Sequence, residues 1–241
     1  MSKKSRCWAV VPAAGVGRRM ESATPKQYLS LNGRPVIEYS LEPLLGHTKI
    51  AGVYVAVAPE DGWWESTACA RHPRVVRVSG GAERCHSVLN ALLLLQQTAE
   101  ADDWVLIHDA ARPCLRPEDL ETLMDQLRDH PVGGLLGVPV RDTMKRVDAS
   151  GRVRETVARE GFWHAYTPQM FRFGLLLQAL EDAVSKRLPV SDDALAMELA
   201  GHAPLMVEGH DDNLKITRPE DLLLASIYLE AQTNSRTATV A

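Results

Sequence analysis

The chain has few cysteines and no long hydrophobic run. Its four cysteines lie far apart, at Cys7, Cys69, Cys85 and Cys114. That spacing predicts neither a zinc site nor a disulfide framework, and it fits a protein of the reducing cytoplasm. No segment approaches the roughly 20 consecutive apolar residues of a membrane-spanning helix. The apolar stretch near the N-terminus is interrupted at Gly15, too early for a signal peptide.

An excess of basic residues is also missing. The 27 lysines and arginines against 31 aspartates and glutamates give a formal net charge of -4. This balance argues against a broad nucleic-acid-binding surface and against a polybasic membrane anchor. With 241 residues, 45% of them hydrophobic, the chain can bury a full core, so we expect one domain over 1–241.

Short apolar runs alternate with helical patterns along the chain. The runs cover 8–11, 53–57, 75–78, 104–107, 135–138 and 205–207. Most lack polar alternation, as strands covered on both faces do. The helical patterns cover 36–45 behind Pro35, a residue suited to a first helical turn, then 88–95, and segments that open at Pro117 and Pro219. We expect the polar tail from Thr233 onward to fray. The alternation predicts a doubly wound, mostly parallel α/β sheet of Rossmann-like type, with ligands at the carboxyl ends of its strands.

Residues 139–165 break this alternation. Two polar, β-prone pieces at 143–147 and 153–157 flank Ala149-Ser150-Gly151, which predicts a β-hairpin arm. An isolated two-stranded ribbon is marginally stable, so we expect the arm to lean on a second subunit. The alternative is a hairpin folded back on its own domain. The arm is basic, which is compatible with simple solvation or with binding a phosphorylated substrate in the partner's site.

A loop of small residues follows the first apolar run. It contains Ala13, Ala14, Gly15 and Gly17, and the cations Arg19 and Lys26 lie beside it. Small residues let backbone N–H groups approach an anion closely, so the segment predicts a triphosphate site. It is neither a P-loop, which needs Gly-Lys-Ser/Thr, nor a dinucleotide fingerprint, since Met20 stands where a third small residue is required. An ordinary surface turn is the alternative.

Polar residues also follow the run at 104–107. Asp109 comes directly after it, where a carboxylate can hold Mg²⁺ against phosphate oxygens. Its alternative role is to cap a turn. The adjacent His108 has no partner at metal-ligand spacing, so we interpret it as a structural, hydrogen-bonded residue.

Two further segments carry candidate ligand groups. Backbone groups at Gly81 and Ala82 could meet a base edge, and Ser87 could donate a hydrogen bond. A plain strand-to-helix turn with Ser87 at the helix start is equally compatible. Lys215 lies between apolar neighbours near Asp212, which could orient it; a solvated surface lysine is the alternative.

The order of the motifs resembles the 2-C-methyl-D-erythritol 4-phosphate cytidylyltransferase family. The resemblance spans nearly the whole chain and is carried by 13–20, 25–28, 80–87, 108–113, 141–143, 167–169, 191–193 and 208–221. It implies a Rossmann-like nucleotidyltransferase that makes a cytidine-diphospho alcohol from CTP and methylerythritol phosphate, and that releases pyrophosphate. It further implies a Mg²⁺-dependent homodimer with active sites completed by exchanged arms.

The resemblance also implies roles for individual residues. Arg19 and Lys26 would stabilise the transition state, and Lys215 and Arg159 would position methylerythritol phosphate, Arg159 and Thr143 coming from the partner's arm. Nucleotide contacts would come from Ala13, Ala14, Gly15, Gly17, Gly81, Ala82 and Ser87. Asp109 would be on the metal side, and Arg112, Thr167, Ser191 and Asp212 would be polar groups of the substrate site. Ala82 stands where an acidic residue is common in the family, and Ser191 where threonine is.

Three alternatives stay open. A ribitol 5-phosphate cytidylyltransferase would present a similar phosphorylated alcohol to the same fold. Sugar-1-phosphate and molybdenum-cofactor nucleotidyltransferases share the glycine-rich opening, but we do not expect them to carry the whole series of motifs. A CTP-binding sensor without catalytic activity is the non-enzyme alternative.

Overall fold

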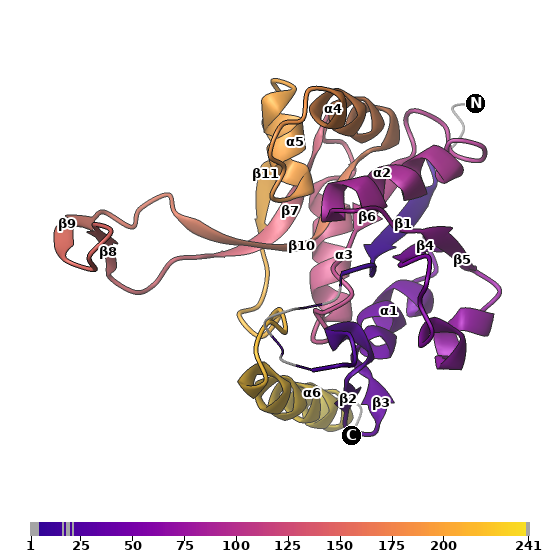
Figure 1. The fold of residues 1–241 in the computed structure, drawn as a ribbon, viewed down its shortest axis with the longest axis horizontal. Helices are drawn as coiled ribbons and strands as arrows, with labels where there is room; N and C mark the ends of the chain where they lie inside the picture. Colours follow the sequence, from indigo (N-terminus) through magenta and orange to yellow (C-terminus); the bar gives the residue numbers. More distant parts are fainter. Residues whose placement is uncertain (1–4, 16, 18–19, 21, 240–241) are drawn as a thin grey trace.

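A seven-stranded sheet forms the centre of the protein in the computed structural model, which describes residues 5–15, 17, 20 and 22–239. Its strands are β1 (Cys7–Pro12), β4 (Ile50–Val57), β5 (Val75–Ser79), β6 (Trp104–Ile107), β7 (Gly133–Pro139), β10 (Trp163–Arg172) and β11 (Leu205–Glu208). Their order is β11-β7-β10-β6-β1-β4-β5 (Figure 1). Strand β10 runs antiparallel to β6 and β7, and the other neighbouring pairs are parallel. The expected mostly parallel sheet is confirmed.

Helices cover both faces of this sheet. α1 (Val36–Gly46) and α3 (Pro117–Gln126) contribute to one apolar cluster, and α2 (Arg84–Leu95), α4 (Phe173–Ser185) and α5 (Asp193–Leu199) contribute to the other. A smaller cluster lies under α6 (Glu220–Thr239). The short strands β2 (Ser30–Leu31) and β3 (Arg34–Pro35) form a separate two-stranded ribbon in contact with α6. The doubly wound arrangement follows from strands that must be buried on both sides.

Strand β1 shows why the strands lack polar alternation. Ala9 and Val11 join one apolar cluster, while Trp8 and Val10 join the other. Because successive side chains point to opposite faces, a strand with a helix layer on each side must be apolar throughout.

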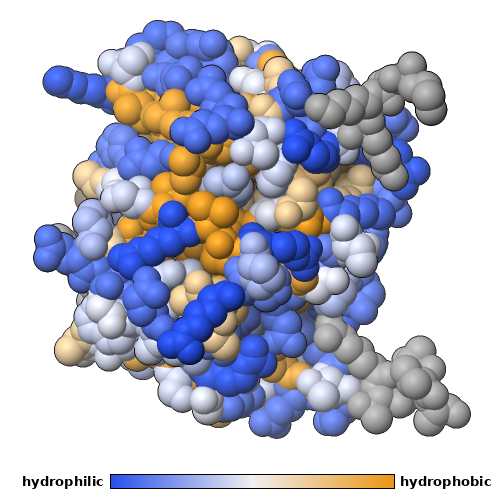
Figure 2. Space-filling view, turned by 90° about the vertical axis from the view of Figure 1, so that its right-hand side faces the viewer, coloured by the Kyte–Doolittle hydropathy of each residue, from blue (hydrophilic) through white to orange (hydrophobic). Residues whose placement is uncertain are grey.

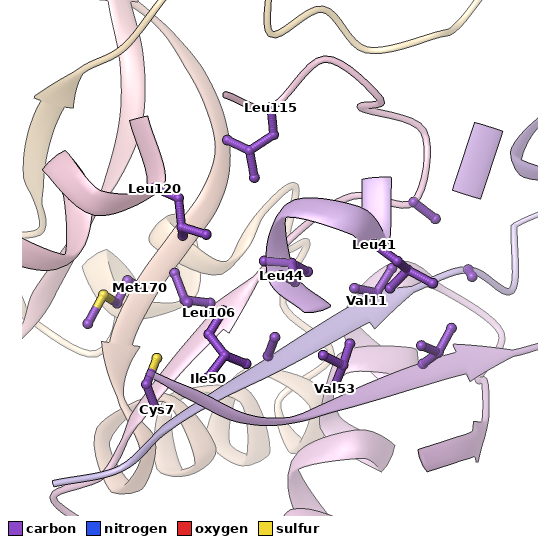
Figure 3. Packing of buried hydrophobic residues seen from close by; sticks show 14 of the residues in the cluster. Cys7, Val11, Leu41, Leu44, Ile50, Val53, Leu106, Leu115, Leu120 and Met170 are labelled. Carbon is purple, nitrogen blue, oxygen red and sulfur yellow. The ribbon is translucent and has the colours of Figure 1, made fainter. Parts of the chain in front are cut away.

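The apolar residues at helical spacing in α1 face the sheet. Leu41 and Leu44 are fully buried and lie over the sheet with Val11 and Val53 (Figure 3). Full burial of such a side chain contributes about 1.5–3 kcal/mol relative to leaving it exposed. This packing holds α1 against the sheet, close to the loops that follow β1 and β6.

Several elements differ from the sequence-based expectations. Helix α2 begins at Arg84 instead of residue 88, and Pro35 belongs to β3 and precedes α1 as its N-cap residue instead of opening its first turn. Helix α6 continues to Thr239, so the expected fraying from Thr233 is not seen. The Gln232 amide anchors this end of the helix by donating to the Cys114 carbonyl oxygen at 3.0 Å.

Strand β10, the longest in the sheet, was not expected from the sequence. Its first four residues are exposed or only partly buried and it contains Pro168, which argues against a central strand. Its register against β7 shifts between Ala165 and Gln169, so the segment around the proline does not pair regularly. Helices α4 and α5 and the ribbon of β2 and β3 were also not expected.

The expected hairpin is present. Strands β8 (Met144–Val147) and β9 (Val153–Val157) pair antiparallel and project far from the sheet beyond β7 and β10 (Figure 1). The alternative of a hairpin folded back on its own domain is wrong. Two of its apolar side chains are exposed, Val147 and Val153, with Val153 60% accessible, and Phe162 is exposed where the arm returns to β10.

The opposite edge of the sheet ends in β5. The space-filling view of that side shows a band of hydrophobic residues between hydrophilic ones (Figure 2). Val76 on β5 is among the exposed apolar residues of the chain. Within the described ranges, no helix has the length and apolar character needed to cross a membrane.

Candidate active site

Three loops at the carboxyl ends of parallel strands enclose the first cavity. They follow β1, β5 and β6, as expected for a doubly wound sheet. The cavity measures about 190 Å³. Its lining comprises Pro12, Ala13, Ala14, Gly15, Lys26, Gln27, Gly81, Ala82, Glu83, Arg84, Ser87, Asp109, Ala110, Ala111 and Lys215. Most of the predicted nucleotide-binding residues are thus brought together.

The first loop is held in place by hydrogen bonds to its backbone, one from the main chain and one from a side chain. Ala13 N–H donates to the Ala56 carbonyl oxygen at 2.7 Å, and the Gln27 amide donates to the Ala13 carbonyl oxygen at 2.6 Å. A Cβ at Gly80 would lie 2.3 Å from the Cβ of Ala14, so the two loops require glycine where they meet. Gly17 has a positive φ of 64°, and a Cβ at this position would lie 3.0 Å from Cγ of Lys26; Gly17 is not among the described residues that line the cavity.

Lys26 lies on a single turn of 3₁₀ helix, Lys26–Tyr28. Its Nζ donates to the Ile216 carbonyl oxygen at 2.9 Å, which joins the first loop to the segment that carries Lys215. The Tyr28 hydroxyl donates to Asp61 at 2.8 Å, and its ring stacks on Trp63. These anchors fix the backbone on which Lys26 projects into the cavity.

The loop before α2 is organised by Ser87. The Gly81 N–H donates to Ser87 Oγ at 3.0 Å, and that hydroxyl donates to the Glu83 carbonyl oxygen at 3.2 Å. Because α2 begins at Arg84, Ser87 lies in the first turn of the helix, where these bonds are compatible with a plain strand-to-helix turn as well as with a nucleotide site. A Cβ at Gly81 would lie 2.4 Å from the Cβ of His86, so this backbone conformation excludes a side chain.

Asp109 is the centre of a cluster of charges. Lys215 Nζ lies 2.6 Å from Oδ2, Arg84 Nε donates to Oδ1 at 3.0 Å, and Arg112 Nε lies 3.8 Å from Oδ2. Burial alone would raise the pKa of Asp109, but Arg84, Lys215 and Arg112 together hold it well below its usual value. The carboxylate is therefore ionised, and it faces these cations instead of capping a turn.

A second cavity, of about 210 Å³, adjoins the first. The two share three charged side chains: Arg84, Asp109 and Lys215. The rest of its lining is Arg112, Ala165, Tyr166, Thr167, Gln169, Ser191 and Asp192. The predicted substrate-binding residues Arg112, Thr167 and Ser191 therefore lie together, and the shared residues form a charged wall between the cavities.

His108 forms hydrogen bonds with two residues that line the second cavity, Arg112 and Thr167. It is fully buried, and its Nε2 donates to the Arg112 carbonyl oxygen while its Nδ1 accepts from the Thr167 hydroxyl, both at 3.1 Å. Burial lowers the pKa of His108 to about 4, so the ring is neutral. The expectation of a structural histidine is confirmed. Thr167 Oγ1 also accepts from the Asp109 N–H at 3.0 Å, which links β10 to the loop after β6.

Asp212 does not lie where the sequence-based prediction placed it. Its carboxylate accepts from Arg116 Nη2 at 2.7 Å and from the Gln232 amide at 2.9 Å, and it lines neither cavity as the described residues define them. The prediction that Asp212 orients Lys215 is wrong, since Asp109 makes that contact.

Two predicted arm residues are not part of the described lining of the cavities, and a third predicted residue falls outside the described part of the chain. Thr143 and Arg159 belong to the arm region and are absent from the described lining of both cavities of their own chain. Arg159 Nη1 donates to the carbonyl oxygen of Arg141. Arg19 lies outside the described residues.

Sequence reasoning gave no role to Arg84 or Asp193. Arg84 lines both cavities and pairs with Asp109 and with Asp193, whose Oδ2 lies 2.8 Å from Arg84 Nη2. The available signals were the position of Arg84 after the Gly80–Gly81 loop and the acidic pair at 192–193, but their contact joins distant parts of the chain.

Comparisons with known proteins agree on one family. Residues 7–231 match the family model described as IspD: 2-C-methyl-D-erythritol 4-phosphate cytidylyltransferase. Curated relatives with that enzyme name include proteins of Pseudomonas fluorescens, 57% identical over 89% of this chain and 92% of the relative, and of Pseudomonas aeruginosa, 56% identical over 90% and 93%. A crystal structure of the Francisella tularensis enzyme superposes with a TM-score of 0.81 at 34% identity, covering 93% of this chain and all of that one. A crystal structure of 4-diphosphocytidyl-2C-methyl-D-erythritol synthase gives 0.82 at 37% identity, covering 95% and 100%. The chain therefore belongs to the 2-C-methyl-D-erythritol 4-phosphate cytidylyltransferase family.

Proposed function

We propose that this protein transfers the cytidylyl group of CTP to 2-C-methyl-D-erythritol 4-phosphate and releases pyrophosphate, a step of the non-mevalonate route to isoprenoids. The observation that carries the proposal is the pair of adjoining cavities that share Arg84, Asp109 and Lys215. A transferase for two anionic substrates needs two sites that meet where cationic side chains can reach both substrates, and Arg84 and Lys215 line both cavities. Family membership identifies which substrates these are.

The first cavity is the proposed CTP site. The backbone of Ala13, Ala14 and Gly15 would bind the triphosphate, because small residues allow close approach of N–H groups to an anion. The Gly81 and Ala82 backbone, held by Ser87, would bind the cytosine edge. If only the backbone at position 82 contacts the base, the departure to Ala82 from an acidic residue changes little.

The second cavity is the proposed methylerythritol phosphate site, with Arg112, Thr167 and Ser191 as its polar contacts. An oxygen of the substrate phosphate attacks the α-phosphorus of CTP in line. A new P–O bond forms, the bond to the bridging oxygen breaks, and pyrophosphate leaves with that electron pair. No covalent enzyme intermediate is needed.

The main barrier to this reaction is electrostatic. A phosphate monoester carries about −1.5 to −2 charge near pH 7, and it must approach a triphosphate. Lys26 and Lys215 are the cations that we propose stabilise the transition state and position the attacking phosphate, together with Arg19 and the partner's Arg159. At 4 Å, a pair of unit charges interacts by about 4 kcal/mol at an effective dielectric constant near 20, enough for a large effect on rate.

Mg²⁺ is the proposed metal, with Asp109 as its protein ligand. The donor set fits, because Mg²⁺ is usually bound by one or two carboxylates together with substrate phosphates, and Asp109 is an ionised carboxylate at the wall of both cavities. Lys215 Nζ already forms an ion pair with that carboxylate, so Lys215 and Mg²⁺ would share Asp109. When bound, the ion would neutralise charge on the phosphate oxygens.

We propose a homodimer in which Thr143 and Arg159 of each arm complete the partner's site. Two observations support this: the hairpin projects into solvent with exposed apolar side chains, and neither residue is part of the described lining of its own cavities (Figure 1). We also propose a cytoplasmic location, which suits four buried, unpaired thiols.

The experiment that tests the function follows pyrophosphate release from CTP and Mg²⁺ with methylerythritol phosphate or ribitol 5-phosphate. Turnover with methylerythritol phosphate is the expected result. Turnover with ribitol 5-phosphate alone would identify the other cytidylyltransferase. CTP binding without turnover on either alcohol would contradict an enzymatic role and indicate a sensor.

A further inference from the structure

A buried ion pair lies behind the wall between the two cavities. Arg84 is the first residue of α2 and Asp193 the first of α5, with Nη2 and Oδ2 2.8 Å apart. Asp193 is 0% exposed, whereas the Arg84 side chain is 23% exposed. Through Nε, the same guanidinium donates to Asp109 Oδ1 at 3.0 Å. Arg84 therefore bridges two carboxylates from different elements.

Stability alone is a poor explanation for this pair. Burying a carboxylate is unfavourable, and apolar replacements of buried ion pairs are often neutral or stabilising. Across the described ranges, neither oxygen of Asp193 has a hydrogen bond of good geometry, and Arg84 is the cation paired with it. The start of α5 is fixed separately, since Asp192 accepts from the Leu195 N–H at 3.1 Å and Gln169 accepts from the Ala194 N–H at 2.8 Å.

The pair has a geometric consequence for the charged wall. Arg84 occupies Oδ1 of Asp109, and Lys215 Nζ lies 2.6 Å from Oδ2. Without Asp193, the Arg84 guanidinium is free to turn both of its ends toward Asp109 or toward a bound phosphate. Either movement changes the hydrogen bonding of Asp109, the carboxylate that holds Lys215 between the cavities.

We infer that Asp193 is a positioning residue, which holds Arg84 across the wall so that Asp109 and Lys215 keep the geometry required for cytidylyl transfer. This inference rests on the proposed function, because the transfer reaction reports on that geometry. Asp193 is absent from the described lining of both cavities, so it acts on the substrates through Arg84.

A net-charge effect and a positioning effect predict opposite changes in kcat for Asp193→Asn. Burial raises the pKa of Asp193, and the paired Arg84 guanidinium opposes that rise by favouring the carboxylate. To the extent that Asp193 is ionised, Asp193→Asn makes the region behind a site for two anions more positive. If net charge were decisive, the variant would bind CTP at least as well and react faster. If positioning is decisive, kcat falls although CTP binding is not weakened, and a displacement of about 1 Å is enough to lower the rate about 10²-fold.

The first test is a double-mutant cycle on kcat with CTP, Mg²⁺ and methylerythritol phosphate, alongside CTP affinity by calorimetry. We expect Asp193→Asn to lower kcat about 10²-fold without weakening CTP binding, and to have no further effect in an Arg84→Gln background. Equal effects of Asp193→Asn in both backgrounds, or a wild-type kcat, would overturn the inference. Asp182→Asn, on the exposed face of α4, is the matched control and should leave kcat unchanged.

Should Asp193→Asn fail to fold in a thermal melt, Arg84→Lys replaces it. Lysine keeps the charge, but one ammonium group cannot reach both carboxylates as the guanidinium fork does. We expect a comparable loss of kcat, and wild-type turnover would contradict the inference.

A spectroscopic measurement separates this inference from the proposed function. The Arg84 Nε–H donates to Asp109, so its NMR resonance should be protected from exchange in the wild type and identifiable by its loss in Arg84→Gln. We expect faster exchange and a shifted signal in Asp193→Asn, and an unchanged signal would overturn the positioning role. Wild-type protein that gives no pyrophosphate would instead contradict the proposed function, while this signal still decides the role of Asp193.

Discussion

Replacing Lys215 with alanine removes the cation that both cavities share with Asp109. Its Nζ lies 2.6 Å from Asp109 Oδ2, and its side chain is only partly exposed. The carboxylate keeps Arg84 at 3.0 Å and Arg112 at 3.8 Å, so we expect the fold to persist. The variant therefore tests the reaction without exposing an unpaired buried charge.

The expected loss follows from Coulomb's law. A cation about 4 Å from a phosphate charge contributes about 4 kcal/mol at an effective dielectric constant near 20. If that contribution is made in the transition state, its loss lowers kcat/KM about 10³-fold, since each 1.36 kcal/mol is a factor of ten.

The assay is steady-state release of pyrophosphate with CTP, Mg²⁺ and methylerythritol phosphate, with CTP affinity measured by calorimetry. Lys186→Ala is the matched control, because Lys186 is an exposed lysine beyond α4 that pairs with Asp182. We expect the control to behave as the wild type. A Lys215→Ala enzyme whose kcat/KM is within tenfold of the wild type would show that Lys215 does not stabilise the transition state.

Three further predictions concern the arm, a buried histidine and the core. Arg159→Ala should mainly raise KM for methylerythritol phosphate, and hybrid dimers with Lys26→Ala should regain one intact site; no recovery in confirmed hybrids would mean that the arm serves its own subunit. Because the folded pKa of His108 is lowered from 6.5 to about 4, its contribution to stability is complete above pH 6.5 and is lost as the pH falls toward 4. Denaturant titrations of substrate-free protein should show the wild type losing about 3 kcal/mol more than His108→Gln over that interval, and parallel curves would contradict the shift. Leu44→Ala should cost about 2–5 kcal/mol in the same titrations, and a cost below about 1 kcal/mol would show that the site is not packed as described (Figure 3).

The sequence predicted well whatever depends on local pattern. Continuous apolar runs indicated strands covered on both faces, and β1 indeed sends Val10 and Val11 into different clusters. Asp109 was correctly placed at a strand's carboxyl end, because that position follows from chain order alone. The hairpin arm was predicted because its polar pieces flank a Ser-Gly turn.

The sequence was less informative where distant segments decide the outcome. Strand β10 escaped prediction because Pro168 and its polar neighbours do not resemble a central strand. Asp212 is three residues from Lys215 in the chain, yet Arg116 on another segment takes its carboxylate. The contact of Arg84 with Asp193 depends on how α2 and α5 pack over one face of the sheet, which no local spacing reveals.

In the proposed reaction, CTP and the phosphorylated alcohol meet at the wall formed by Arg84, Asp109 and Lys215. A crystal structure of the Lys26→Ala variant with both substrates and Mg²⁺ tests it most directly. We expect the α-phosphorus to lie at this wall, with the attacking phosphate oxygen in line from the second cavity. A triphosphate bound elsewhere, or an alcohol phosphate that never enters the second cavity, would contradict it.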